Sequence, residues 1–399
     1  MRTIRNYIQQ TGFYFFNELK RIFRDPGAVL IMIIALVAYP VIYSIAYQNE
    51  VLRNIPVAVA DHSQTSESRQ LTRMTDATEE LEVRYQPGSM HEARELFFDG
   101  KVRGIILIEK EFARHIRSEE QANVSIYCDG TYFLYYKQTL SGAYKSIGTF
   151  SAGIEIKQRM AGGQAMHQAN NNREPLPLKN IQMHNPAGGY GSFVMPGIII
   201  VILQQTLLVG LGMLGGTTNE RQNHFLKIPE RITFGTVTSY LTGRATAYLL
   251  VYLLNGIFTL VWVYDWFGFP NRMEFMDILP LYIPFILAVT FMGMAISTLF
   301  RKREHAFLFM VFMSPIALFI SGISWPAEAI PSTLYSLGHI LPGNFMVPAY
   351  LRMRTMGASL SDVSFELNGL FVQLVFYFLL ALFASGIQLK RIKTDKGKT

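Results

Sequence analysis

Six stretches of the chain contain no Asp, Glu, Lys or Arg, and each is about as long as a membrane crossing requires. An α-helix needs roughly 20 apolar residues to cross the hydrocarbon core of a bilayer. Backbone groups in hydrocarbon must be hydrogen-bonded within the protein, so each stretch predicts a helix, interrupted where Pro occurs. The predicted spans are residues 28–47, 186–219, 245–264, 278–300, 306–327 and 367–389.

The pattern changes between the first two spans. Short β-rich runs alternate there with polar segments of helical character, and a longer, mostly helical stretch follows. Alternation of strands and helices indicates an α/β layer. The expected strands are residues 55–60, 81–85, 104–108 and 123–128, and the expected helices are residues 63–74, 89–99, 110–117 and 132–166.

The predicted fold class is therefore an α-helical polytopic membrane protein with six transmembrane helices and an inserted α/β extracytoplasmic domain. The domains follow in order along the chain. They are a cytoplasmic interfacial amphipathic helix (1–27), the first transmembrane helix (28–48), the extracytoplasmic α/β domain (49–188), five further transmembrane helices (189–390) and a basic cytoplasmic tail (391–399).

The segment before the first span interleaves aromatic and aliphatic residues with Glu18, Lys20, Arg21 and Arg24. Such a pattern is typical of an amphipathic helix lying at the membrane surface, here ended by the sequence DPG at 25–27. A soluble helix packed on a partner is the alternative.

A second unusual segment, 322–348, carries Trp325, Pro326, Pro331 and Pro342 among apolar residues. Pro removes a backbone donor and breaks a helix, so this segment is too irregular to span. We predict two short helices that dip into the membrane from the outer face; a packed surface loop is the alternative.

Half of the residues are hydrophobic and 16% are charged, and the formal net charge is +7. Residues 50–189 hold 16 Lys and Arg against 17 Asp and Glu, so the positive excess lies on the rest of the chain. If the N-terminus is cytoplasmic, the inside segments carry 17 basic residues and the two short outside loops carry three. This bias predicts both termini in the cytoplasm and the α/β domain outside, and it disfavours a nucleic-acid partner.

Ionisable residues are absent from the six predicted spans, which disfavours a proton- or sodium-coupled carrier. The chain has no GxxxxGK[ST] motif, so it has no P-loop for nucleotide phosphates. Its histidines and Cys128 lack ligand spacing, and we expect no metal site. Gly212 and Gly216 are spaced as GxxxG, which favours close packing of helices.

Several short sequences occur in a characteristic order along the whole chain. They are NELKRIFRDP at 17–26, VAVAD at 57–61, GKVRGIILI at 100–108 with EF at 111–112, YCDG at 127–130, NP at 185–186 before VMPG at 194–197, NER at 219–221, and GISWP at 322–326 with IP at 330–331. In this order and spacing the chain resembles the ABC type-2 exporter permeases, in the subgroup with a large external domain between the first two spans.

The resemblance implies that the cytoplasmic loop 219–242 contains a coupling helix that docks into a groove of a separate ATPase subunit. The positions that fall on it are Glu220, Arg221, Phe225, Leu226 and Pro229. An ordinary charged loop is the alternative. The interfacial helix would form part of the same ATPase-facing surface, with Glu18, Lys20, Arg21 and Arg24 available for contacts.

The resemblance also implies the wider assembly. The chain would be a multi-pass transporter subunit of the cell inner membrane, not an enzyme, with no cofactor of its own and with ATP and Mg bound by the partner ATPase. It would pair with an identical or similar permease and leave room for a periplasmic adaptor on the external domain. The implied activity is efflux of an amphipathic or lipid-like substrate such as a drug or a lipid.

Two other classes remain as alternatives. A membrane-anchored receptor or scaffold would bind a ligand or adaptor through the external domain, although an anchor needs only one or two spans. An integral membrane transferase would need a catalytic cluster at the edge of a span, and the nearest candidates are Asp265, Glu274 and Asp277.

Overall fold

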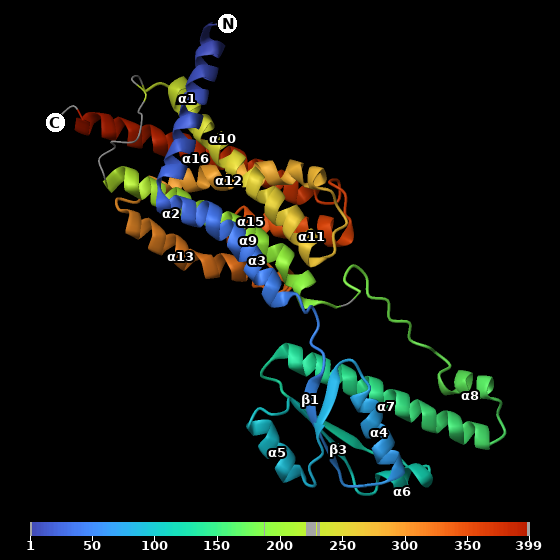
Figure 1. Cartoon of the computed structure of the whole chain (residues 1–399). Helices are drawn as coiled ribbons and strands as arrows, with labels where there is room; N and C mark the ends of the chain where they lie inside the picture. Colours follow the sequence, from blue (N-terminus) through green and yellow to red (C-terminus); the bar gives the residue numbers. More distant parts are fainter. Residues whose placement is uncertain (1, 187, 221–228, 230–231, 397–399) are drawn as a thin grey trace. The chain divides into compact units, whose positions relative to one another are not determined.

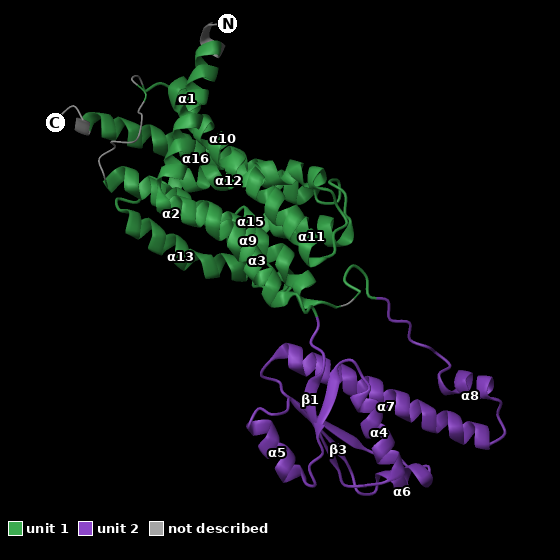
Figure 2. Ribbon diagram, in the orientation of Figure 1, with its two compact units in different colours: residues 1–50, 182–399 green, residues 51–181 purple. Residues whose placement is uncertain are grey.

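The computed structural model describes residues 2–186, 188–220, 229 and 232–396. The chain divides into two compact units (Figure 2). One combines Met1–Glu50 with Gln182–Thr399 and holds the candidate membrane spans; the other, Val51–Ile181, holds the sheet (Figure 1).

The helical unit begins with α1 (Arg2–Arg24) and continues into a first span of three consecutive pieces. All of its elements, with π-helical and 3₁₀ segments labelled η, are as follows: α2 (Pro26–Val29), η1 (Leu30–Ala35) and α3 (Leu36–Tyr47); α9 (Tyr190–Glu220); α10 (Phe234–Ile257), η2 (Phe258–Trp262) and α11 (Val263–Phe267); α12 (Phe275–Ser297); α13 (Arg303–Ile320); η3 (Ala327–Ala329), α14 (Ser332–Gly338), α15 (Gly343–Leu351) and η4 (Arg352–Met356); and α16 (Ser364–Lys396).

Six helices within the described residues are long and apolar enough to cross a membrane, which confirms the predicted number of spans. They are Pro26–Tyr47, Tyr190–Glu220, Phe234–Phe267, Phe275–Ser297, Arg303–Ile320 and Ser364–Thr394. The second of them, α9, is the central helix: 89% of its most apolar stretch is buried within the unit, against 17% for α13. The visible ends of α1 and α16 lie at the same end of this unit (Figure 1).

The second unit is an α/β layer, as the sequence predicts. Its elements are β1 (Ile55–Asp61), α4 (Ser66–Asp76), β2 (Leu81–Tyr85), α5 (Met90–Phe98), β3 (Gly104–Ile108), α6 (Phe112–Arg117), β4 (Val124–Cys128), α7 (Phe133–Ala161) and α8 (Met166–Arg173). The strand order is β2-β1-β3-β4, with β4 antiparallel to β3 and the other pairs parallel. The strand bounds agree with the expected ones to within one residue.

Alternation along β1 explains why both faces of this sheet are covered. Val57 and Val59 lie in a core shared with Leu71 of α4 and Phe150 of α7, whereas the small Ala58 and Ala60 lie in a second core with Ala93 of α5. Successive side chains of a strand point to opposite faces, so one strand serves both cores.

Glu50, where the chain leaves the helical unit, is hydrogen-bonded to the start of α9, where the chain enters the bundle again. The Glu50 carboxylate accepts hydrogen bonds from the Ser192 hydroxyl at 2.7 Å and from the Ser192 backbone N–H at 3.0 Å. The Glu50 carbonyl accepts from the Tyr190 N–H at 2.8 Å. The α/β unit is thus an insertion whose two connections start side by side.

Two expectations about the spans need correction. The third span starts at Phe234, not at 245, so part of the expected loop 219–242 is the first turns of α10 and Arg244 lies inside a long helix. The fifth span ends at Ile320, because a left-handed Gly322 follows and Pro326 comes soon after. The helix that contains the third span therefore carries Arg244 just before the charge-free stretch 245–264.

The GxxxG face of α9 packs closely against another helix, as expected, and that helix is α13. A Cβ added at Gly216 would lie 2.7 Å from Arg303 Cα and 2.7 Å from the Lys302 carbonyl oxygen. At Gly212 the nearest atom, Ala306 Cβ, would be 3.4 Å away. The two helices approach most closely at Gly216.

We therefore expect Gly216→Ala to destabilise the protein by about 1–3 kcal/mol, because backbone atoms of α13 would have to move. Gly212→Ala is the matched control and should change stability by no more than about 0.5 kcal/mol. Thermal unfolding of the purified protein in detergent measures both. Equal effects of the two substitutions would contradict this account of the α9–α13 contact.

Candidate functional site

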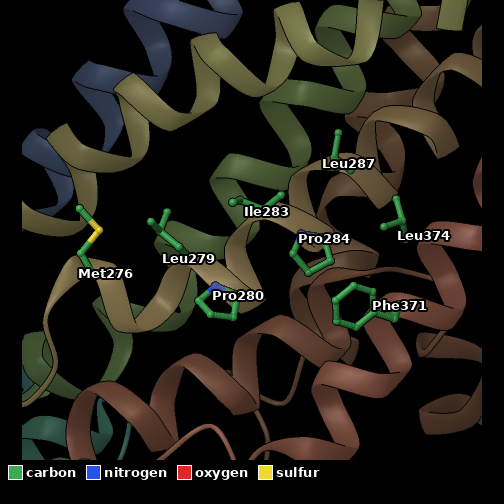
Figure 3. Close-up of a pocket in the computed structure, with 8 residues that line it drawn as sticks. All are labelled: Met276, Leu279, Pro280, Ile283, Pro284, Leu287, Phe371 and Leu374. Carbon is green, nitrogen blue, oxygen red and sulfur yellow. The ribbon is translucent and has the colours of Figure 1, made fainter. Parts of the chain in front are cut away.

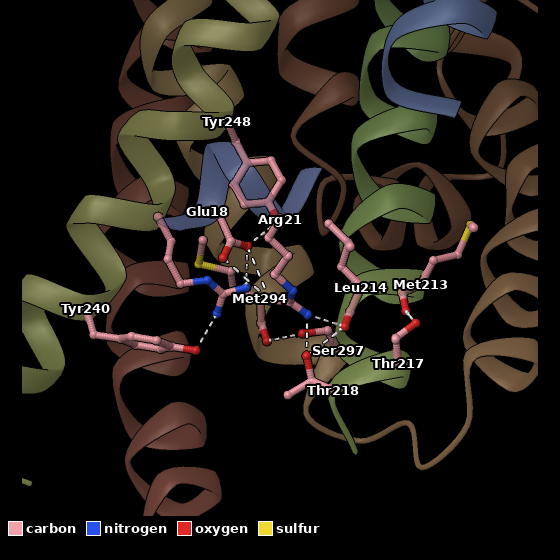
Figure 4. A network of polar contacts seen from close by, with 11 residues as sticks. Glu18, Arg21, Met213, Leu214, Thr217, Thr218, Tyr240, Tyr248, Met294 and Ser297 are labelled. Carbon is pink, nitrogen blue, oxygen red and sulfur yellow. Dashed lines mark hydrogen bonds and ion pairs between the residues drawn. The ribbon is translucent and has the colours of Figure 1, made fainter. Parts of the chain in front are cut away.

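A buried carboxylate, Glu18 of α1, lies at the centre of a polar network between α1 and α10 (Figure 4). Glu18 Oε1 accepts hydrogen bonds from Arg244 Nη2 at 2.9 Å and from the Tyr248 hydroxyl at 2.5 Å. Arg244 Nη1 donates to the Tyr240 hydroxyl at 2.8 Å. The Glu18 side chain therefore joins the first helix to two positions of α10, and Tyr240 holds Arg244 in place from within α10.

The spacing of residues on both helices produces this network. Tyr14, Glu18 and Ile22 recur every four residues and form the buried face of α1. On α10, Tyr240, Arg244 and Tyr248 recur in the same way. Gly243 lets the helices approach, because a Cβ there would collide with the Thr11 carbonyl oxygen.

Arg21 extends the network from α1 to the end of α9. Its Nη1 lies 3.5 Å from Glu18 Oε1, and its Nη2 donates to the Leu214 carbonyl and to the Thr218 hydroxyl. Both acceptors lie in the last two turns of α9. Since α9 ends at Glu220, Arg21 bonds directly to the helix end that precedes the expected coupling loop.

A second ion pair ties α13 to the same end of the unit. Arg303 forms a two-pronged bond with Asp25, with Nη1–Oδ2 at 2.6 Å and Nη2–Oδ1 at 2.8 Å. Its Nη1 also lies 3.3 Å from the Thr217 hydroxyl, and its backbone N–H lies 3.4 Å from Glu220 Oε2. Such bidentate pairs are among the stronger polar contacts in proteins. Helices α1, α9, α10 and α13 are thus connected by charged groups at one end.

Electrostatics at Glu18 follow from two opposing effects. Burial alone raises the pKa of this carboxyl, but the Arg244 and Arg21 guanidinium charges and two hydrogen bonds outweigh burial and lower its pKa to about 2. For Asp25, burial likewise raises the pKa, and its bonds to Arg303 and to the Ala28 N–H lower it below the ordinary value. Both carboxyls are therefore ionised at neutral pH.

The structure separates the four expected contact residues of α1 into two pairs. Lys20 and Arg24 are exposed. Glu18, at 3% exposed, and Arg21 are engaged inside the unit. The expectation that all four are available to an ATPase does not hold for Glu18, because α10 covers it.

Of the five expected coupling residues, Glu220 and Pro229 are described. Glu220 is the exposed last residue of α9, and Pro229 is buried. Arg221, Phe225 and Leu226 lie outside the described residues. The docking role of this loop remains a prediction.

The segment 322–348 contains the short helix α14 and most of α15. Trp325, Pro326 and Pro331 are exposed, whereas Pro342 is buried and precedes α15. Gln204 of the central helix accepts from the Gly343 N–H at 2.6 Å, which fixes the start of α15 against α9. Whether α14 and α15 enter the membrane remains a prediction.

Sequence reasoning missed Arg244, Tyr248 and Arg303 as site residues. Arg244 and Tyr248 contact a carboxylate more than 220 positions away, and the sequence carries no signal for that pairing. One hint was present: Tyr240, Arg244 and Tyr248 recur at helical spacing, which places a charge and two phenols on one helix face.

An apolar groove of about 490 Å³ lies between α12 and α16, away from the polar network (Figure 3). Every lining residue is apolar. They are Met276, Leu279, Pro280, Ile283, Pro284 and Leu287 of α12 with Phe371 and Leu374 of α16. The groove can accommodate hydrocarbon and offers no polar side chain to orient a soluble ligand.

Residues 27–383 match the family model described as ABC-2 family transporter protein. No curated protein and no solved structure matches the chain. Among the described residues there is no group of three or more His, Cys, Asp or Glu side chains that could hold a metal ion.

We expect Glu18→Gln to destabilise the protein by about 3 kcal/mol at pH 7, because it leaves Arg244 buried without its carboxylate. Lys20→Gln, an exposed change on the same helix, is the control and should have little effect. Thermal or denaturant unfolding in detergent measures both.

The difference in stability between wild type and Glu18→Gln should also depend on pH. Because the pKa of Glu18 is lower in the folded chain than its ordinary value of 4.5, its stabilising contribution is complete above pH 4.5 and is lost as pH falls toward about 2. The stability difference between wild type and Glu18→Gln should shrink over this window. A difference that stays constant down to pH 2.5 would show that the Glu18 charge is not what stabilises the fold.

Proposed function

The chain belongs to the ABC-2 family of transporter proteins, and on that premise we propose that it forms the export pathway for an amphipathic or lipid-like molecule, with force received through the loop between α9 and α10. The observation that carries this proposal is the charged network that joins α1, α9, α10 and α13 beside that loop. As a member of this family the chain is a non-catalytic transmembrane subunit, and its family implies an ATPase partner.

The network gives the loop a mechanical connection to the spans. The loop is bounded by Glu220 at the end of α9 and by the first turn of α10. Arg21 and Arg303 bond to α9 within one turn of that boundary, and Arg244 lies in the third turn of α10. A displacement of the loop would therefore move α1, α9, α10 and α13 together as a rigid body.

ATP and Mg are proposed to act only in the partner subunit. The chain has no P-loop motif, so the energy of nucleotide hydrolysis has to enter through a protein contact. Exposed Lys20 and Arg24 on α1 and exposed Glu220 provide charged contacts at the same end of the unit as the loop. We assign these three residues, with the loop residues 221–228, to the ATPase-facing surface, and the buried Pro229 to the base of the loop.

The cargo and the assembly are also proposals. The groove between α12 and α16 is lined only by apolar side chains, which suits a lipid-like or drug-like substrate better than a soluble polar one. A second permease, identical or similar, would complete the pathway. The α/β unit is the part available to a periplasmic adaptor. A receptor or scaffold role gains no support from the family match.

The proposed location is the cell inner membrane, with both termini in the cytoplasm and the α/β unit outside. The visible ends of α1 and α16 lie at one end of the helical unit, which supports a topology with both termini on the same side of the membrane (Figure 1). The basic residues of the short loops favour the cytoplasm for that side.

Scrambling residues 220–229 should abolish copurification of the ATPase subunit with the tagged chain and should abolish the ATPase activity of the complex. Arg21→Gln should behave differently: the docking surface stays, so the ATPase should still copurify, but export should fall at least several-fold because α1 is released from α9.

Arg84→Gln in the α/β unit is the control for Arg21→Gln, since Arg84 is exposed and pairs with Glu82, two residues before it on the same strand. Copurification is measured by affinity capture and export by substrate accumulation in cells. Full assembly and export with the scrambled loop would refute the coupling assignment.

Topology is tested by labelling in a Cys128→Ser background. Cys128 is the only cysteine, so one added cysteine reports on one position. Ser118→Cys, on the α/β unit, should react with a membrane-impermeant maleimide from the outside. Thr394→Cys, at the end of α16, should react only after permeabilisation. The reverse pattern would invert the proposed orientation.

A further inference from the structure

Arg354 is a buried charge at the far end of the helical unit from the Glu18 network. Tyr240 and Arg244 lie near the start of the span Phe234–Phe267, and Tyr264 lies near its end. The Arg354 guanidinium stacks on the Tyr264 ring, with Cζ 3.1 Å from the ring centre. Arg354 itself is 1% exposed. This end of the unit therefore contains a second buried cation.

The hydrogen bonding of Arg354 is incomplete. Its Nη1 donates to the Leu260 carbonyl at 3.1 Å and to the Tyr350 hydroxyl at 2.8 Å. Its Nε and Nη2 are buried and have no partner among the described residues. Within the same residues no carboxylate forms an ion pair with Arg354, as Glu18 does with Arg244. A buried guanidinium with two unused donors is costly unless something else accepts from it.

A cavity of about 260 Å³ adjoins this guanidinium. Arg354 lines it together with Asp265, Asn271 and Glu274. The three smaller side chains are exposed, so the cavity opens to the surface, and neither carboxylate bonds directly to Arg354. An isolated anion at Arg354 would be repelled by Asp265 and Glu274, and an isolated cation would be repelled by Arg354. A group that carries both charges satisfies both sides.

Neighbouring residues place this cavity at the depth of lipid headgroups. Trp262 and Trp266, which flank Asp265 along the helix, are exposed, and Trp side chains gather at membrane–water interfaces. On the next helix, the apolar groove begins at Met276, two residues after Glu274. A molecule with a charged head in the cavity would thus find an apolar surface on the same helix.

We propose that this cavity binds a zwitterionic group, with its phosphate toward the Arg354 side chain and its primary ammonium toward Asp265 and Glu274. The headgroup of phosphatidylethanolamine has this chemistry, and so does free phosphoethanolamine. The site is separate from the coupling network and does not depend on the proposed transport function, because binding can be measured on this chain without an ATPase.

The test is thermal unfolding of the full chain in detergent with added lipid. Phosphatidylethanolamine should raise the Tm of the wild type by about 5 °C, and phosphatidylglycerol, which supplies the phosphate without the ammonium, should raise it much less. The double variant Asp265→Asn/Glu274→Gln keeps Arg354 and its stacking, so it should fold but lose the preference for phosphatidylethanolamine. Glu328→Gln, an exposed carboxylate outside the cavity lining, should keep it.

Free phosphoethanolamine distinguishes the two sources of the group. Stabilisation by the lipid that millimolar phosphoethanolamine does not reproduce assigns the site to a lipid headgroup, and equal stabilisation assigns it to a soluble zwitterion. An equal response of the wild type to both lipids would overturn the proposal. So would a preference for phosphatidylethanolamine that survives in the double variant.

Discussion

The helical unit depends on one constraint: a charge removed from water must be balanced by groups that the protein itself supplies. Glu18 is a carboxylate on an amphipathic helix, and burial alone would make its ionised form unfavourable. Two arginines, one on its own helix and one on α10, reverse this preference. The position of α1 against the bundle therefore depends on Glu18, because moving the helix would leave Arg244 buried without a carboxylate.

The same constraint explains where polar groups occur in a largely apolar unit. The Glu18 and Asp25 clusters lie at the end that contains the loop between α9 and α10, and Arg354 lies near the end of the long α10–α11 helix. Between them the helices meet mainly through apolar side chains, with a few buried hydrogen bonds such as that from the Tyr282 hydroxyl to the Tyr252 carbonyl at 2.7 Å. Polar contacts at the ends fix the relative positions of the helices, and apolar contacts in the middle permit small shifts.

Much of the fold could be predicted from the sequence because it depends on local patterns. Charge-free stretches gave the six spans, and short β-rich runs gave the four strands almost to the residue. The start of α10 was missed because Arg244 was treated as the edge of a loop, on the assumption that a charge cannot lie inside a span. That assumption fails when a carboxylate from another helix covers the charge, and no local pattern identifies such a partner. Arg354 is one of the three basic residues that were assigned to the outside loops from the sequence, although it is among the most buried side chains.

The connection between a docking loop and a membrane pathway requires stiffness more than strength. If the two helices that flank the loop could rotate freely, a displacement of the loop by the ATPase would cause only local motion and would not move the spans. Here α9 and α10 are both bonded to α1, and α13 is bonded to α9 and to the residue that starts the first span, Asp25. Because charged hydrogen bonds are directional, the four helices are constrained in rotation as well as in distance. A displacement of the loop then has to move these four helices together against the remaining spans.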